Sequence, residues 1–220
     1  MSVQSVYTRA ITLHEVGAGR YDIRFEQLPK RNVSLSGWLQ SYKYFEQVED
    51  QLRVDFTFQS SVLEPARRWL EKQTPERWRT ERKTFVRVLI HVRRKDHISS
   101  KLVRMGYTSP TLDYFRRAMS YFTECLERVL FVVLSDDMKW CMRHLIASHI
   151  VYSRGHSPIV DLAISSLCDH AIITVGSYSW WAAWFANGIT ITQKNYPRNG
   201  SAITSIFRRE DHYKPEWIGL

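Results

Sequence analysis

Two arginines that follow a strand-like apolar run are the first candidates for chemistry in this chain of 220 residues. The run VLIHV at 88–92 gives way to RRKD at 93–96. Guanidinium groups are planar, permanently charged donors that match the oxygens of a diphosphate. The stretch therefore indicates a phosphate site at Arg93 and Arg94; the alternative is a solvated charge cluster after a strand.

A second polar stretch, TVGSYS at 174–179, also follows an apolar run. Gly176 allows close backbone approach, and Ser177 stands where a new helix would begin. The free N–H groups of a helix N-terminus attract anions. The stretch indicates a further phosphate contact, with a plain strand-to-helix turn as the alternative.

The third stretch is SDD at 135–137. One interpretation is structural: Ser135 caps the next helix, and the two aspartates complement the helix dipole. The other is functional: Asp136 or Asp137 accepts hydrogen bonds from a ribose or from a base. His91 is open in the same way, as a ligand-contacting group or as a core histidine that satisfies a backbone carbonyl.

These stretches need a scaffold that brings them together, and the pattern from residue 85 onward predicts one. Apolar runs of strand character alternate with amphipathic helical stretches, which is typical of βαβ units. The expected strands are 85–92, 130–134, 149–153, 171–175 and 189–192. Helices are expected to begin at SP 109–110, after Ser135, at SP 157–158 and at 177–178.

The predicted fold class is therefore α/β, a Rossmann-like parallel sheet with flanking helices. In such sheets ligands bind beyond the carboxyl ends of the strands, where the three stretches meet. Residues 85–220 are expected to form this nucleotide-binding domain. Residues 1–84 are less regular and are expected to be a connecting, partly helical segment. Trp180, Trp181 and Trp184 are interpreted as core rather than as a platform for sugars.

Composition narrows the function classes. The net charge is +9 and the sequence pI is about 9.6, which favours an anionic partner. No zinc-finger spacing, basic zipper or RNA-recognition signature occurs, so nucleic-acid binding is not expected. Three cysteines without a C-x-x-C pair argue against a cysteine metal site and against a dense disulfide scaffold. Cys125 is expected to pack on a helix face, and pairing of Cys141 with Cys168 is left open.

No targeting segment is recognised in the sequence. The first residues lack a charged stretch followed by an apolar one. The longest apolar run, WWAAWFA at 180–186, is too short to cross a bilayer.

Several of these segments, in order, resemble the galactoside α-1,2-fucosyltransferases. HVRR at 91–94 and FVVLSDDMKWC at 131–141 are similar to the first two motifs of that family. The remaining similar segments are CDHAIITVGSYSWWAA at 168–183, GWLQSYKYF at 37–45, IF at 206–207 and PEWIG at 215–219. Lys95 and His97 depart from the family, which usually has glycine and tyrosine at these positions.

The resemblance implies a GDP-fucose donor, and an acceptor glycan that ends in β-galactose. Fucose would pass to the galactose 2-hydroxyl with inversion and without a metal. The family is two-lobed, GT-B-like and anchored in the Golgi membrane with a lumenal catalytic part. The chain is expected to hold the donor-binding half, without the anchor or the first lobe. The alternative is a catalytically inactive relative that binds GDP or a glycan.

The resemblance also assigns roles to individual residues. Arg93 and Arg94 would hold the diphosphate. Asp96 is the candidate general base, and the alternative is a base that lies outside this chain. His91 would orient the donor. The other expected donor contacts are Ser135, Asp136 and Asp137 toward the nucleoside, and Thr174, Gly176 and Ser177 toward the phosphates.

Overall fold

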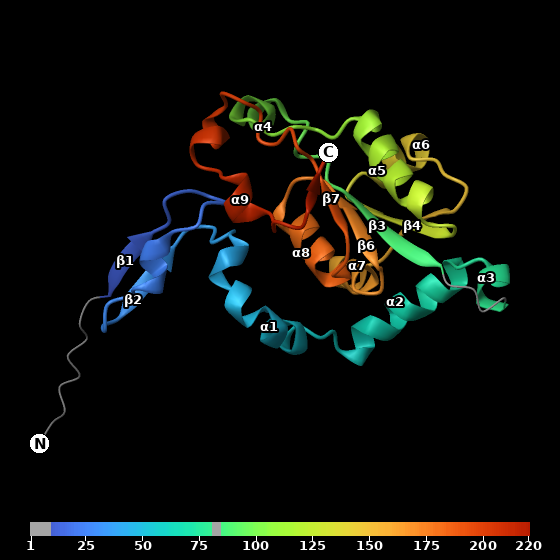
Figure 1. Ribbon diagram of the computed structural model, residues 1–220, viewed down its shortest axis with the longest axis horizontal. Coiled ribbons are helices and arrows are strands. Elements are labelled where there is room, and N and C mark those ends of the chain that lie inside the picture. Colours follow the sequence, from blue (N-terminus) through green and yellow to red (C-terminus); the bar gives the residue numbers. More distant parts are fainter. Residues whose placement is uncertain (1–9, 81–84) are drawn as a thin grey trace, which may run out of the picture.

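The computed structural model describes residues 10–80 and 85–220 as a layered α/β fold (Figure 1). Residues 1–9, where no leader pattern was recognised, and 81–84, at the expected segment boundary, lie outside the described residues. The main sheet has the order β5-β4-β3-β6-β7-β8, and every neighbouring pair is parallel. Its strands are β3 (Val86–Val92), β4 (Val129–Ser135), β5 (Ile150–Tyr152), β6 (His170–Ile173), β7 (Thr190–Thr192) and β8 (Ile218–Gly219). The predicted α/β, Rossmann-like parallel sheet is confirmed.

The central strands are apolar along their whole length because both faces of the sheet are covered. Successive side chains of a strand point to opposite faces. In β3, Val88 and Ile90 enter one core layer, and Leu89 enters the other. His91 shares the face of Leu89, so it points toward the helix layer on that side. The strand alternation thus determines which helix His91 can reach.

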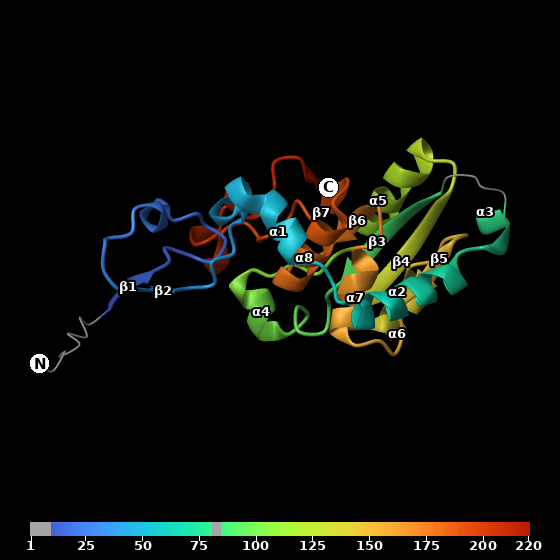
Figure 2. The ribbon, with the colours of Figure 1, turned by 90° about the horizontal axis from the view of Figure 1, so that it is seen from below.

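Helices cover the two faces of the sheet (Figures 1 and 2). On one face lie α2 (Ser60–Gln73), α7 (Pro158–Ser165) and α8 (Ser177–Ala186), with α8 against β3 and β6. On the other face lie α5 (Leu112–Cys125) and α6 (Met138–His144).

Two helix starts differ from the predictions. The helix expected at Ser109 begins at Leu112, because the Thr111 hydroxyl caps it by accepting the Tyr114 N–H at 3.1 Å. Ser135 is not the cap of α6: the Asp137 carboxylate accepts the Trp140 N–H at 3.3 Å and takes that place. The helix predicted at 157–158 is confirmed, with proline in its first turn.

Residues 10–80 contain more regular structure than the sequence indicated. Strands β1 (Ile11–His14) and β2 (Val33–Ser36) form a small parallel sheet that lies away from the main sheet (Figure 1). Helices α1 (Glu49–Asp55), α2 and α3 (Glu76–Thr80) then run beneath the main sheet in this view. Tyr42, Ala66, Leu70 and Trp78 enter the same core as α7 and α8.

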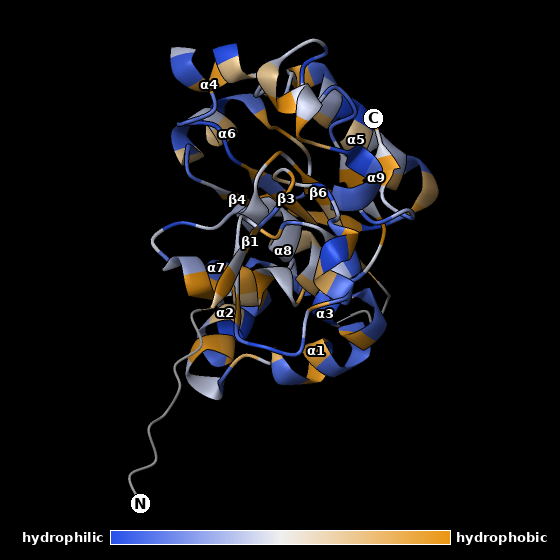
Figure 3. Ribbon diagram, turned by 90° about the vertical axis from the view of Figure 1, so that its left-hand side faces the viewer, coloured by the Kyte–Doolittle hydropathy of each residue, from blue (hydrophilic) through white to orange (hydrophobic). Residues whose placement is uncertain are grey.

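The remaining helices are α4 (Ser100–Met105), after β3, and α9 (Arg209–His212), before β8. Coloured by hydropathy, helices such as α1, α3 and α4 show hydrophilic and hydrophobic residues mixed along their length (Figure 3). Strand β8 was not predicted, because its two residues carry too little pattern. Within the described residues, no helix combines the length and apolar character needed to cross a bilayer.

The structure settles the cysteine alternatives. Cys141 and Cys168 are both free and buried, and they belong to core layers on opposite faces of the sheet, so they do not pair. Cys125 is exposed at the end of α5, and its predicted packing against a helix face is wrong.

Candidate functional site

The predicted phosphate residues converge at the switch point of the sheet. Strands β3 and β6 are neighbours, and the chain leaves them toward opposite edges, which opens a crevice at their carboxyl ends. The loops that follow the two strands are joined there. The Arg93 N–H donates to the Thr174 hydroxyl at 2.8 Å, and the Thr174 N–H donates to the His91 carbonyl at 3.2 Å.

Arg93 lies directly over the start of α8. A Cβ placed on Gly176 would lie 3.2 Å from the Cδ atom of Arg93, so a side chain there would press on the arginine. Gly176 also has φ +128°, a conformation that side chains disfavour. Gly176 is the N-cap residue of α8 and has no side chain that could cap the helix. The first N–H groups of α8 therefore remain available to an anion. A guanidinium and a helix N-terminus thus face the same small volume.

Asp96 forms an ion pair with the guanidinium of Arg93. The Nε atom donates to Oδ1 at 3.1 Å, and an Nη atom donates to Oδ2. The arginine lowers the pKa of the Asp96 carboxyl through these hydrogen bonds, and the pKa of Arg93 is raised in turn. In this arrangement Asp96 is a carboxylate that neutralises the charge an anion would otherwise meet.

Arg94 takes a different direction from Arg93. Its guanidinium lies 4.9 Å from the ring centroid of Trp140 and 3.9 Å from the Asp137 carboxylate, both at the start of α6. Arg93 instead faces α8. The two arginines that the sequence treated as one pair therefore flank β3 on different sides.

The SDD stretch holds the arginine loop in place. The Asp136 carboxylate accepts the backbone N–H groups of Arg94 and Lys95, at 2.9 and 3.1 Å. Ser135 accepts the Asp137 N–H at 2.9 Å. These hydrogen bonds leave Asp136 as a support for the loop, beside the space where a ligand would lie.

His91 is a buried link between β3 and α8. Its Nδ1 atom lies 2.6 Å from the Ser179 hydroxyl, and its ring lies 4.9 Å from that of Tyr178. Burial lowers the pKa of His91 to about 3, so the imidazole is neutral near pH 7. The geometry suits a group that positions α8 against the arginine loop.

A cavity of about 370 Å³ extends from Arg93 toward α7, and we name it the arginine cavity. Its lining includes His91, Ser135 and Asp161. The Asp161 carboxylate accepts the Ser153 hydroxyl at 2.6 Å, and burial raises its pKa. Asp161 was not predicted from the sequence, since a lone acidic residue in a first helical turn is common; its place after the third strand was the only signal.

Two further cavities continue from the same arginine. The middle cavity, about 310 Å³, is lined by Arg93, Asp96, Gly176 and Ser177 on one side and by Trp38, Gln40 and His212 on the other. The aromatic pocket, also about 310 Å³, shares Trp38, Gln40, Ser177 and His212 with it. The three cavities therefore follow one another, with Arg93 between the first two and Ser177 between the last two.

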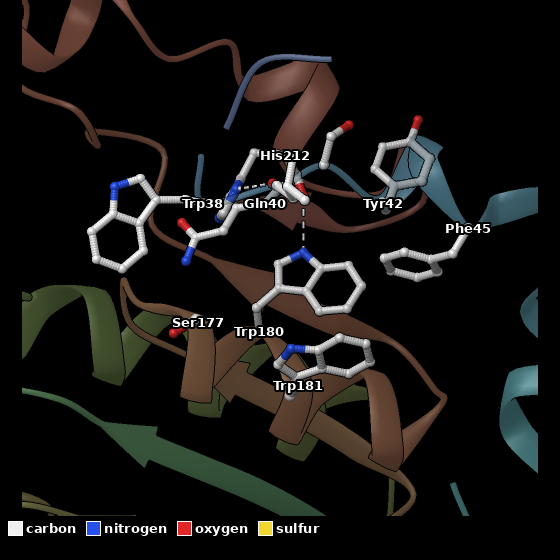
Figure 4. A pocket seen from close by; sticks show the side chains of 10 residues that line it. Trp38, Gln40, Tyr42, Phe45, Ser177, Trp180, Trp181 and His212 are labelled. Carbon is white, nitrogen blue, oxygen red and sulfur yellow. Dashed lines mark hydrogen bonds between the residues drawn. The ribbon is translucent and has the colours of Figure 1, made fainter. Parts of the chain in front are cut away.

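The aromatic pocket collects side chains from distant parts of the chain (Figure 4). Trp38 and Gln40 lie at one end, Tyr42 and Phe45 at the other, and Trp180 and Trp181 between them. The Trp180 indole N–H donates to the His212 carbonyl at 2.8 Å.

The core interpretation holds for Trp180 and Trp184, which are buried, whereas Trp181 is half-buried. Trp180 and Trp181 also line the aromatic pocket. His212 is buried, and its Nδ1 atom lies 2.8 Å from the Gln40 carbonyl, which ties the tail of the chain to the segment before α1. No sequence signal pointed to His212.

This chain is similar to known glycosyltransferases. The family model described as glycosyl transferase family 11 matches residues 13–220. A rabbit (Oryctolagus cuniculus) galactoside alpha-(1,2)-fucosyltransferase 1 is 32% identical over 89% of this chain and 53% of its own length. A Bos taurus galactoside 2-alpha-L-fucosyltransferase SEC1 is 30% identical over 90% of this chain and 54% of its own length. The chain thus spans about half the length of these curated relatives.

Among solved structures, POFUT1 in complex with GDP is similar with a TM-score of 0.49 and 11% identity. The match covers 77% of this chain and 57% of that one.

Proposed function

The chain belongs to glycosyl transferase family 11, and from this we propose that it binds GDP-fucose and transfers fucose to the 2-hydroxyl of a terminal β-galactose. Curated relatives named galactoside α-1,2-fucosyltransferases support the donor and the acceptor class. We further propose that the chain is the donor-binding half of a two-lobed, GT-B-like enzyme.

The observation that carries the donor site is the position of Arg93 over the bare N-terminus of α8. A leaving GDP gains negative charge on its β-phosphate as the bond to fucose breaks. A preoriented guanidinium and helix N–H groups stabilise that charge without reorganisation. The proposed diphosphate contacts are Arg93, Thr174, Gly176 and Ser177.

The nucleoside is proposed to enter the arginine cavity. Guanine presents an N1–H and an amino group side by side, and a carboxylate accepts both. Asp161 is a half-buried carboxylate in this cavity, and it already accepts a hydrogen bond from one neutral donor, the Ser153 hydroxyl. Two guanine donors would stabilise its charged form and offset the burial that raises its pKa. Ser135 and Asp136 are proposed to lie beside the ribose of GDP. Arg94 and Asp137 are proposed to hold the arginine loop against α6.

Asp96 remains the proposed general base, with a change of partner. A diphosphate that pairs with Arg93 would release the Asp96 carboxylate toward the middle cavity, which both residues line. The galactose 2-hydroxyl oxygen then attacks the anomeric carbon of fucose while the bond to the β-phosphate oxygen breaks. The hydroxyl proton passes to Asp96, and the configuration at the anomeric carbon inverts.

The remaining proposals follow the family. Arg93 and the α8 amides supply positive charge for the diphosphate, and the proposed reaction uses no metal. No group of three His, Cys, Asp or Glu side chains in residues 10–80 and 85–220 is placed to hold one. We propose the Golgi lumen as the site of action, with GDP-fucose and a galactose-terminated glycan as partners and no nucleic acid.

Calorimetric titration with GDP tests the donor site. We expect Arg93→Ala to lower the GDP affinity about 100-fold, because a charge-assisted contact to phosphate is lost. The Arg94 side chain faces Trp140, so Arg94→Ala should lower the GDP affinity less, by about tenfold. Arg68→Ala, on the exposed side of α2, is the control. A folded wild-type chain without GDP affinity would contradict the proposal.

A product assay with GDP-fucose and lactose separates the enzyme from an inactive GDP-binding relative. Transfer that depends on Arg93 supports the enzyme. GDP binding that is abolished in Arg93→Ala, without any transfer, would favour the binding protein.

A further inference from the structure

The turn that carries Trp38 is held in an unusual conformation. The Glu15 carboxylate accepts the backbone N–H groups of Trp38 and Leu39, at 2.8 and 3.0 Å. Leu39 has φ +50° and Gly37 has φ +151°, and a Cβ on Gly37 would lie 2.4 Å from the Cβ atom of Glu15. Bulky residues adopt positive φ only where the surroundings require it. The Glu15 carboxylate thus holds the backbone of the turn that carries Trp38.

The indole presented by this turn is exposed and has no partner among the described residues. Trp38 is 75% exposed, and within the described part of the chain its side chain makes no hydrogen bond or ring contact. Three other rings of the aromatic pocket have partners: the Phe45 and Trp181 rings stack with centroids 5.7 Å apart, and the Trp180 indole donates to the His212 carbonyl. A strained backbone therefore displays a free indole face.

Trp38 also borders the place where donor and acceptor must meet. It lines the middle cavity together with Arg93 and Asp96, and the aromatic pocket together with Gln40 and Ser177. Apolar walls with a few convergent polar groups are typical of a small-molecule site. Gln40 offers an amide, and Ser177 offers a hydroxyl beside the proposed diphosphate contacts.

We infer that Trp38 is the stacking surface for the terminal β-galactose of the acceptor, with Gln40 as a polar contact. The inference rests on the proposed function and adds the acceptor subsite to it. A β-galactoside has one face of C–H groups that packs against an aromatic ring, while its hydroxyls need polar partners. Galactose on Trp38 would direct a hydroxyl into the middle cavity toward Asp96, on the opposite side of Ser177 from the nucleoside.

Saturation-transfer NMR with lactose tests the inference on the whole chain, saturated with GDP. We expect Trp38→Ala to weaken lactose binding about tenfold, the typical cost of truncating an aromatic anchor. Trp38→Tyr keeps an aromatic face and should restore most of the affinity. Ile146→Ala, which removes an apolar side chain that is 77% exposed elsewhere, is the matched control and should change nothing.

The GDP affinity of each variant, measured in parallel, separates the two proposals. Lactose binding that falls in Trp38→Ala while GDP binding stays at the wild-type level supports the inference. Lactose binding that is absent in the wild type, or unchanged in Trp38→Ala, overturns it and leaves the donor site intact. A folded wild-type chain that does not bind GDP would instead contradict the proposed function.

Discussion

Asp96 accepts two hydrogen bonds from the guanidinium of Arg93, at the point where the arginine cavity meets the middle cavity. The pair is partly exposed, with relative side-chain exposures of 36% for Arg93 and 44% for Asp96. An entering diphosphate can therefore compete with the carboxylate for the same donors. Under the proposed function, Arg93 would receive the diphosphate of the donor, and Asp96 would be the counter-ion that it displaces.

Asp96→Asn should separate binding from transfer. Removing the competing negative charge should leave GDP affinity unchanged or raise it several-fold, because the arginine no longer has to be released. Transfer to lactose should fall at least about 100-fold, because an amide does not accept the hydroxyl proton. Calorimetry and a product assay give the two values. An Asp96→Asn chain that transfers fucose at the wild-type rate would contradict the assigned role.

Asp161→Asn should weaken recognition of guanine. Inosine diphosphate lacks the exocyclic amino group of GDP, so the ratio of the two affinities reports the contact proposed for Asp161. We expect the wild type to prefer GDP about tenfold or more, since a hydrogen bond to a charged group contributes about 1.5–3 kcal/mol. The preference should disappear in Asp161→Asn. An equal preference in both proteins would show that Asp161 does not read the base.

Gly176→Ala should damage the donor site and the fold together. The new methyl group meets the Arg93 side chain, and φ +128° disfavours alanine. We expect a loss of about 1–3 kcal/mol in the free energy of unfolding and about a tenfold loss of GDP affinity.

Gly200→Ala is the matched control for Gly176→Ala. Gly200 has φ +71° with nothing within 4 Å of an added Cβ, so it carries strain without a clash. Gly200→Ala should lower the free energy of unfolding, measured by urea unfolding, and should leave the GDP affinity at the wild-type level. Normal GDP binding by Gly176→Ala would show that close approach at this position is not required.

Two buried histidines predict an acid-sensitive fold. Burial lowers the pKa of His91 to about 3 and that of His212 to about 4. In the unfolded chain both groups titrate near pH 6.5, so below that pH the unfolded state binds more protons than the folded state. Their contribution to stability is complete above pH 6.5 and is lost as the pH falls toward 4.

Urea unfolding between pH 7.5 and 4.5 measures this effect. Each histidine should add a slope of up to about 1.4 kcal/mol per pH unit to the free energy of unfolding. The slope should be smaller by that amount in His212→Gln, whatever the variant loses in overall stability. A slope equal to that of the wild type would show that His212 is protonated in the folded chain.

The sequence by itself was sufficient for the sheet and for one half of the site. Apolar runs between amphipathic helices predicted a parallel sheet, and a parallel sheet brings its carboxyl ends to one edge, so Arg93 and Gly176 could be expected together. Local hydrogen bonds were harder to predict. Whether Ser135 or Asp137 caps α6 depends on small differences in backbone angle that composition does not encode.

Tertiary structure alone decided what the predicted residues face. The adjacent arginines diverge because successive positions beyond a strand leave it in different directions, so Arg93 reaches α8 and Arg94 reaches Trp140. Trp38 and His212 are 174 positions apart, and only the folded chain brings them to the same pocket. The short-range pattern of apolar and polar residues predicts which helices and strands form. Side-chain packing between distant segments determines the shape and charge of the cavities between them.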